Sequence, residues 1–221
     1  MNWANRVTLI RLVLIPIIII VMFLGPAKGY GWDVITTKFT SGNYSLSLTD
    51  LLAGILFILA SLSDMLDGYI ARKYNQVTSF GKFFDSIADK LLTNLLLVVF
   101  AVIGILPLWI VLIFIGRDFI IDVVRQLLAS QKTIMSANNL GRYKAAIQML
   151  GLSILFFVGL ASWNDNGEWL YGEFGLINQI VMIPTYTAAI LSVAAALNYM
   201  ILNKEVLFSM SSDHGHGEKN E

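Results

Sequence analysis

Long apolar runs alternate with short polar segments along this chain. Six runs approach the roughly 20 apolar residues that a helix needs to cross a hydrocarbon layer of about 30 Å. They cover residues 7–24, 49–70, 83–106, 107–130, 145–163 and 177–202. The third and fourth runs meet at Leu106 and Pro107, which favours a tight helical hairpin because proline can begin a helix but cannot continue one. The pattern predicts an all-α, polytopic membrane protein with six transmembrane helices.

The composition agrees with this prediction. Of 221 residues, 57% are hydrophobic and 14% are charged, against about 45–50% and about 25% in an ordinary soluble domain. We expect one membrane domain over residues 1–210 and a disordered polar tail over 211–221. That tail holds His214 and His216, but a metal site is not expected there, because no third ligand is near and glycines surround the pair.

The distribution of charge predicts an orientation in the membrane. Fifteen basic residues balance fifteen acidic ones, so no overall field indicates a nucleic-acid partner. The expected external segments, 25–48 and 164–176, hold only Lys28 and Lys38, and the other thirteen basic residues lie in expected cytoplasmic segments or helix ends. Cytoplasmic segments are enriched in Lys and Arg, so we expect both termini in the cytoplasm.

Four aspartates lie near the expected cytoplasmic ends of the second and third apolar runs. Asp64 and Asp67 are three residues apart and Asp85 and Asp89 four apart, so each pair shares one face of its helix. Carboxylates near hydrocarbon cost at least a few kcal/mol and usually face a cavity and a partner. If residues 73–80 fold the two helices antiparallel, four oxygen ligands converge, which suits two Mg²⁺ or Mn²⁺ ions. The chain has no cysteine, so a thiolate site is excluded.

Small residues and one arginine accompany these acids. Gly68 and Gly81 each cost about 1 kcal/mol relative to alanine within a helix, and the missing side chains let a planar or phosphorylated ligand approach the backbone. Ala71 extends the strip of small residues, and Arg72 supplies a cationic fork suited to phosphate. A purely structural interpretation, with packing glycines and aspartates that end helices, explains one or two of these positions but not all eight.

The full spacing resembles a known family. Asp64-x2-Asp67-Gly68-x2-Ala71-Arg72-x8-Gly81-x3-Asp85-x3-Asp89 matches every position of the pattern of the CDP-alcohol phosphatidyltransferases. The resemblance implies a six-helix membrane enzyme, usually a homodimer, in the cytoplasmic membrane of a bacterium. It implies metal binding by Asp64, Asp67, Asp85 and Asp89, a catalytic base role for Asp89, and CDP contacts by Asp64, Asp67, Gly68, Ala71, Arg72, Gly81, Asp85 and Thr8.

Further charges within or near the later apolar runs bear on the acceptor alcohol. The cations Arg117, Arg125, Arg142 and Lys144 are candidates to bind an acceptor phosphate, which carries between one and two negative charges near neutral pH. A neutral acceptor would not need them. In the alternative interpretation, Arg142 and Lys144 extend to the cytoplasmic interface, and Arg117 pairs with Asp118 or Asp122.

A second resemblance concerns the acceptor. Asn5-x2-Thr8-x2-Arg11-x4-Pro16, with Arg117-Asp118, Gly141-x2-Lys144 and Gln148-Met149, is similar to the branch of this family that uses glycerol 3-phosphate, although the family often has Arg-Glu in place of Arg117-Asp118. It implies transfer from CDP-diacylglycerol, with metal ions stabilising the departing CMP while Asp89 takes the proton of the acceptor hydroxyl.

Two kinds of alternative remain. Inositol phosphate, serine or phosphatidylglycerol would be other acceptors for the same chemistry. A divalent-cation transporter is the alternative from another class, because intramembrane aspartates also line ion pathways. It gives no role to Arg72 or to the glycines beside the aspartates.

Overall fold

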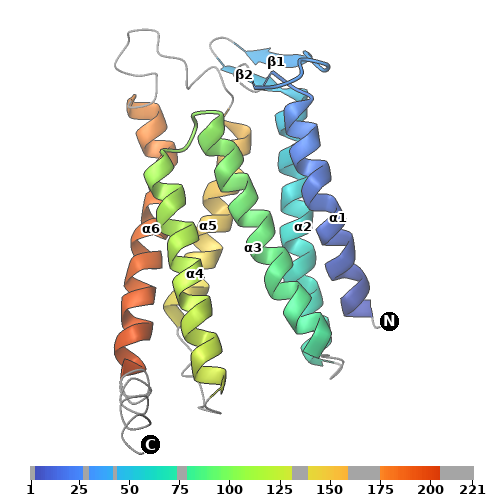
Figure 1. Ribbon diagram of the computed structural model, residues 1–221. Helices are drawn as coiled ribbons and strands as arrows, with labels where there is room; N and C mark the ends of the chain where they lie inside the picture. Colours follow the sequence, from blue (N-terminus) through green and yellow to red (C-terminus); the bar gives the residue numbers. More distant parts are fainter. Residues whose placement is uncertain are drawn as a thin grey trace, which may run out of the picture.

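In the computed structural model of the chain, the described residues form six long helices and one short β-hairpin (Figure 1). The structure describes residues 3–26, 30–41, 44–73, 79–130, 139–158 and 175–204. In these ranges the elements are α1 (Trp3–Phe23), β1 (Lys38–Ser41), β2 (Tyr44–Ser47), α2 (Leu48–Lys73), α3 (Ser79–Val102), α4 (Leu108–Ser130), α5 (Asn139–Phe157) and α6 (Leu176–Leu202). The all-α class with six helices is confirmed, with the hairpin as an addition.

Both boundaries of the fifth helix differ clearly from the expectation. The fifth helix begins at Asn139 rather than at residue 145, and it ends at Phe157 rather than at 163. Arg142 and Lys144 therefore lie in the first two turns of α5 and not ahead of it. Hydropathy marks only the apolar part of a helix, whereas the backbone hydrogen bonds continue through polar turns at its end.

A five-residue turn joins α3 to α4 and confirms the expected tight hairpin. Gly104 has a φ of 76°, a left-handed conformation that glycine adopts without steric cost. The backbone N–H groups of Ile105 and Leu106 donate to the carbonyl oxygen of Phe100 at 2.9 and 3.2 Å. Pro107 directly precedes the first residue of α4. The two helices are consequently held close together at this end.

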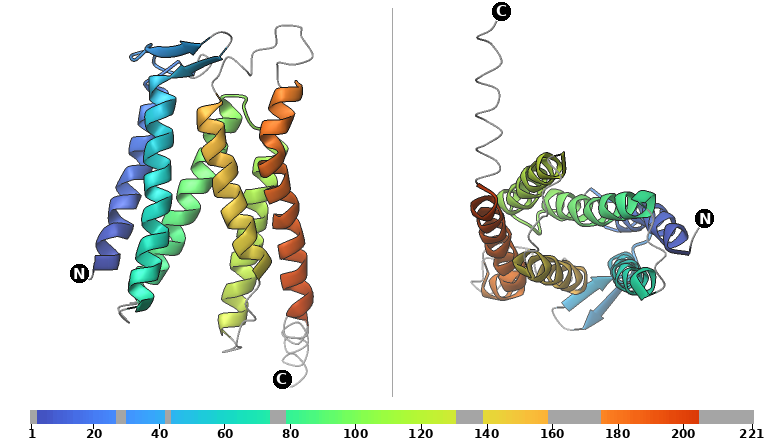
Figure 2. Two further views of the ribbon diagram at one scale, coloured as in Figure 1. Left: turned by 180° about the vertical axis from the view of Figure 1, so that it is seen from behind. Right: turned by 90° about the horizontal axis from the view of Figure 1, so that it is seen from below.

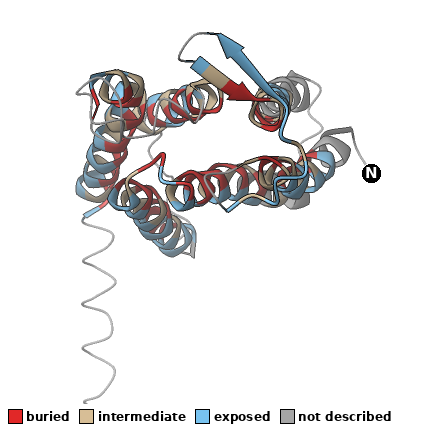
Figure 3. Ribbon diagram, turned by 90° about the horizontal axis from the view of Figure 1, so that it is seen from above, coloured by how far each residue is buried: buried red, intermediate tan, exposed pale blue. Residues whose placement is uncertain are grey.

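The helices pack as two sets of three that share one core. Helix α1 contacts α2 and α3, and α6 contacts α4 and α5, while α2 with α5, and α3 with both α4 and α5, join the two sets. Viewed along the bundle, the buried faces turn inward and the exposed faces outward (Figure 3). Rings from three helices meet in the core, where the centroid of Phe156 lies 5.6 Å from that of Phe57 and 4.9 Å from that of Phe100.

The outward faces of the bundle are strongly apolar. Phe119 is 73% exposed, Ile190 70% and Leu112 61%. Soluble monomers rarely expose wide apolar patches, so these faces are unusual for a soluble protein. Among the described residues, α6 alone meets the length and hydropathy expected of a membrane-crossing helix, and Thr8–Phe23 and Leu48–Ser63 form shorter apolar stretches.

The two ends of the bundle differ. The start of α1, the end of α6 and the ends of α2 and α3 that flank residues 74–78 lie at one end, and the hairpin and the α3–α4 turn lie at the other (Figures 1 and 2). The Tyr44 hydroxyl donates to the carbonyl oxygen of Phe157 at 2.5 Å and so fastens the hairpin to α5. The tail 211–221, with His214 and His216, lies outside the described residues.

Candidate active site

The eight signature positions fall near the end of α2 and the start of α3, the two helix ends that residues 74–78 connect. Asp67 lies six residues before the end of α2 and Asp85 six residues after the start of α3, or about 9 Å from each end at 1.5 Å per residue. Asp64 and Asp89 lie nine and ten residues from the same ends, at about 14 and 15 Å. Helix bounds thus bring the two pairs to matching depths.

The small and cationic signature residues lie closer to the helix ends. Gly68 is five residues from the end of α2, Ala71 two and Arg72 one, and Gly81 is two residues from the start of α3. The signature therefore has two layers, with carboxylates deeper in the bundle and residues suited to a nucleotide nearer its end.

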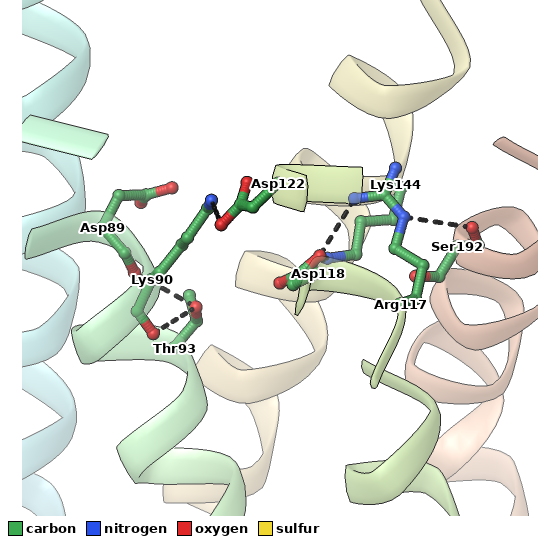
Figure 4. A network of polar contacts seen from close by, with 8 residues as sticks. All are labelled: Asp89, Lys90, Thr93, Arg117, Asp118, Asp122, Lys144 and Ser192. Carbon is green, nitrogen blue, oxygen red and sulfur yellow. Dashed lines mark hydrogen bonds and ion pairs between the residues drawn. The ribbon is translucent and has the colours of Figure 1, made fainter. Parts of the chain in front are cut away.

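Of the eight signature side chains, the structure describes that of Asp89, which is half-buried, and the other seven lie outside the described side chains. The hydroxyl of Thr93 donates to the carbonyl oxygen of Asp89 at 3.1 Å and lies one turn further along α3 (Figure 4). Thr8, the expected CDP contact on α1, is buried, and α1 packs against both α2 and α3.

The residues present fit a hard divalent cation by their chemistry. The signature supplies carboxylates at similar distances from two consecutive helix ends, and oxygen donors suit Mg²⁺ or Mn²⁺. Among the side chains described, no group of three or more His, Asp or Glu residues is placed to hold a metal. Metal binding by Asp64, Asp67, Asp85 and Asp89 stays a prediction.

A buried group of charges lies on α4 and α5. Oδ1 of Asp118 accepts hydrogen bonds from Nη1 of Arg117 at 2.9 Å and from Nζ of Lys144 at 3.2 Å (Figure 4). Nε of Arg117 donates to the backbone carbonyl oxygen of Ser192 on α6 at 3.2 Å. We call Arg117, Asp118 and Lys144 the buried charge cluster. Its hydrogen bonds connect α4 with α5 and, through the Ser192 carbonyl, with α6.

The electrostatics of this cluster favour an anion. Asp118 is 8% exposed and Lys144 5%, and burial of unpaired charges is very costly. The three groups of the cluster have a formal net charge of +1, and the carboxylate of Asp89 on α3 also attracts Lys144 electrostatically. Nζ of Lys144 also lies 5.2 Å from the centre of the Phe114 ring, which stabilises the ammonium group. An anionic ligand would neutralise the remaining charge.

The structure separates the four expected acceptor cations into two kinds. Arg117 and Lys144 meet in the buried cluster, and Arg117 pairs with Asp118, as one alternative expected. Arg142 is exposed on the first turn of α5, in agreement with the alternative that it extends to an interface. Arg125 is exposed, with its guanidinium carbon 6.0 Å from the ring centre of Tyr199.

Several buried polar residues near the cluster were not proposed as site residues from the sequence. Gln148 is 4% exposed and follows Lys144 by one helical turn, a spacing that places both on the same face of α5. Ser192 is completely buried, and its hydroxyl, like the amide nitrogen of Gln148, has no hydrogen-bond partner among the described residues. The sequence could have indicated both residues, since polar residues within apolar helices usually face the protein interior.

Lys90 is a further residue that sequence reasoning left without a role. Its Nζ pairs with Oδ2 of Asp122, which links α3 to α4. Asp122 is therefore the partner of Lys90, whereas the alternative interpretation had offered it as a partner for Arg117. The signal was its position directly after Asp89, the last residue of the signature.

A carboxylate signature at the ends of two helices and a buried charge cluster on α4 and α5 are together suited to anionic substrates. The family model described as CDP-alcohol phosphatidyltransferase matches residues 1–207. The chain therefore belongs to the CDP-alcohol phosphatidyltransferase family, and it is an enzyme. The resemblance found in the signature spacing is confirmed.

Individual relatives are similar over most of their length. A CDP-diacylglycerol–glycerol-3-phosphate 3-phosphatidyltransferase of Bacillus subtilis is 39% identical over 159 residues, covering 72% of this chain and 78% of the relative. Enzymes with the same name are 34% identical in Mycoplasma genitalium, over 76% of this chain and 71% of theirs, and 32% identical in Rickettsia bellii, over 90% and 93%.

Proposed function

We propose that this enzyme transfers the phosphatidyl group of CDP-diacylglycerol to sn-glycerol 3-phosphate, giving phosphatidylglycerophosphate and CMP. The relatives named above, all called CDP-diacylglycerol–glycerol-3-phosphate 3-phosphatidyltransferases, support this choice of donor and acceptor. The single structural observation that carries the choice of a charged acceptor is the net positive, buried cluster on α4 and α5. An acceptor without a phosphate group, such as serine, gives less reason to bury Lys144.

The donor belongs to the set α1–α3, which we call the donor half. Gly68, Ala71, Arg72, Gly81 and Thr8 would receive the cytidine diphosphate group beside the carboxylates. Enzymes of this family use a divalent metal ion. Asp64, Asp67, Asp85 and Asp89 would hold one or two such ions. Mg²⁺ or Mn²⁺ bound there would neutralise the charge of the diphosphate and of the departing CMP.

The acceptor belongs to the set α4–α6, which we call the acceptor half. Arg117 and Lys144 would bind the phosphate of glycerol 3-phosphate, because charged N–H donors in a buried site give strong hydrogen bonds to phosphate oxygens. Arg125 and Arg142, both exposed, would attract the acceptor on its approach from the cytoplasm.

The chemistry is a single displacement at phosphorus. Asp89 accepts the proton of the acceptor's 1-hydroxyl, and the hydroxyl oxygen attacks the phosphorus next to the diacylglycerol. The bond from that phosphorus to the oxygen of CMP breaks, and CMP leaves with the bonding electrons. Positioning of the two substrates and neutralisation of charge supply most of the catalysis in such transfers.

We propose that all six helices cross the bacterial cytoplasmic membrane with both termini in the cytoplasm. The helices contain 19 to 27 residues, or about 28 to 40 Å at 1.5 Å per residue, and they expose large apolar side chains outward. The start of α1 and the end of α6 share one end of the bundle (Figure 1). A homodimer, as the family resemblance implies, completes the proposal.

Measuring CMP release from CDP-diacylglycerol by the purified enzyme tests the function. Glycerol 3-phosphate, inositol phosphate, serine and phosphatidylglycerol would be compared as acceptors, each with Mg²⁺ and with Mn²⁺. We expect turnover with glycerol 3-phosphate to exceed that with the others. A preference for serine or another acceptor without a phosphate group would contradict the proposed acceptor and leave only the family assignment.

A further inference from the structure

Lys90 and Asp122 form an ion pair between the donor half and the acceptor half. Lys90 lies on α3 directly after Asp89, and Asp122 lies on α4 one turn after Asp118 (Figure 4). Consecutive residues of a helix point about 100° apart. Lys90 therefore faces α4 and not the side that Asp89 faces, and its ammonium group pairs with Asp122 across the helix boundary.

The Lys90–Asp122 pair lies far from the turn that joins α3 to α4, so a small change in the angle between these helices moves the pair by a large distance. The five-residue turn holds α3 and α4 together at one end of the bundle, and the two helices diverge toward the other (Figure 1). Lys90 lies twelve residues before the end of α3 and Asp122 fourteen after the start of α4, about 18 and 21 Å from the turn. A change of about 5° in the angle between the helices would move these levels apart by about 2 Å.

Such a movement would separate the two halves of the reaction. Asp89 and Lys90 occupy neighbouring positions on α3, and the buried charge cluster begins at Arg117 on α4, one to two turns from Asp122. A displacement of 1 Å from the reactive geometry costs about 10²-fold in rate. The distance that the pair fixes is the distance between the proposed base and the proposed acceptor site.

We propose that Lys90 and Asp122 are positioning residues that set the separation of the donor and acceptor halves for phosphatidyl transfer. The inference rests on the proposed function, since it assigns the two substrates to the two halves. The side chains are 30% and 35% exposed, and neither residue is among those assigned to the binding of a substrate. Removal of either charge is therefore expected to change the spacing of α3 and α4, and with it turnover, more than the binding of either substrate.

A charge exchange separates this role from general packing. Lys90→Met and Asp122→Asn should each lower kcat by about 10- to 100-fold, while the KM for either substrate changes less than about threefold, because each half keeps its own binding residues. Exchange of both charges, Lys90→Asp with Asp122→Lys, should recover most of the lost kcat. The conservative Lys90→Arg should stay near wild type. Lys38→Met, at the hairpin end of the bundle, is the matched control and should leave kcat unchanged.

Thermal unfolding of each variant in detergent shows whether it is folded. If the exchanged pair unfolds early, Lys90→Arg combined with Asp122→Glu provides the second test, because it keeps the charges and changes only their reach. The proposal is overturned if folded single variants keep wild-type kcat, or if the charge-exchanged or conservative pair is as slow as the single variants. Wild-type enzyme without transfer to glycerol 3-phosphate contradicts the proposed function instead, and the same variants can then be compared with whichever acceptor is used.

Discussion

The residues proposed for the donor half lie close together along the chain, whereas those proposed for the acceptor half lie far apart. The donor signature covers residues 64–89, on two helices that only residues 74–78 separate. The acceptor side joins Arg117 and Asp118 on α4 with Lys144 on α5 and the backbone of Ser192 on α6. Short-range spacing on a helix is readable from the sequence, whereas partners 75 residues apart meet only through packing.

The two halves also manage charge differently. Four aspartates and one arginine give the donor signature a formal charge of −3, which suits the metal ions proposed above. The buried charge cluster contains its own counter-ion, since Asp118 holds both Arg117 and Lys144. The donor half is therefore expected to depend on added metal, and the acceptor half to be organised before its ligand arrives.

Removal of a donor carboxylate should have the largest effect. Asp64→Asn, Asp67→Asn or Asp85→Asn should each abolish CMP release, and so should extensive treatment with EDTA. A bound metal contributes several kcal/mol to stabilisation of the transition state, which corresponds to about 10³-fold or more in rate. Asp33→Asn is the matched control, because Asp33 is exposed and has a φ of 51°, which asparagine tolerates. Near-normal turnover by a folded Asp67→Asn enzyme would refute the metal assignment.

The second effect distinguishes chemistry from binding within the donor half. Asp89→Asn should lower kcat by about 10²- to 10⁴-fold, the usual contribution of a general base, and should weaken donor binding much less. Steady-state kcat and direct titration with CDP-diacylglycerol would be measured on the same preparation. Equal losses of donor affinity and turnover would assign Asp89 to metal holding alone.

The fold was predictable from the sequence as far as apolar runs define it. Six helices and the tight turn at Pro107 followed from hydropathy and proline chemistry. The start of α5 at Asn139 did not, because polar residues such as Arg142 continue a helix without leaving a hydropathy signal. The β1–β2 hairpin was also missed, although the Gly-Asn dipeptide between its strands is a turn signal.

The site was predictable only in its local part. The spacing of Asp64, Asp67, Asp85 and Asp89 placed the donor signature on two helix ends, and their matching depths agree with it. The sequence left the partner of Arg117 open between Asp118 and Asp122, since both lie on the same helix within reach. Packing of α3 against α4 decides the matter, because it supplies Lys90 as the partner of Asp122.

The third prediction tests whether the acceptor half works through its buried cluster. Lys144→Met should raise the KM for glycerol 3-phosphate by about 10- to 100-fold, because one hydrogen bond to a charged group is worth about 1.5 to 3 kcal/mol. The donor KM should stay nearly unchanged. Arg125→Met should raise the acceptor KM less, since Arg125 is exposed and its attraction is screened. An equal or larger effect of Arg125→Met would move the phosphate site to the surface of α4.

The smallest expected effect concerns how the acceptor half is held together. A Cβ atom added at Gly151 on α5 would lie 2.8 Å from the Thr185 hydroxyl oxygen on α6 and 3.3 Å from the Thr185 backbone nitrogen. Gly151→Ala should therefore destabilise the protein by about 1 to 2 kcal/mol, since overpacking costs about 1 to 3 kcal/mol and the gain in helix propensity offsets up to about 1. At Gly116 on α4 the same atom would meet nothing within 4 Å, so Gly116→Ala should stabilise slightly. Thermal unfolding in detergent measures both changes. If Gly151→Ala lowers the unfolding temperature and Gly116→Ala raises it, close backbone contact between α5 and α6 supports the acceptor half. Equal shifts of the two unfolding temperatures would exclude this role of the contact.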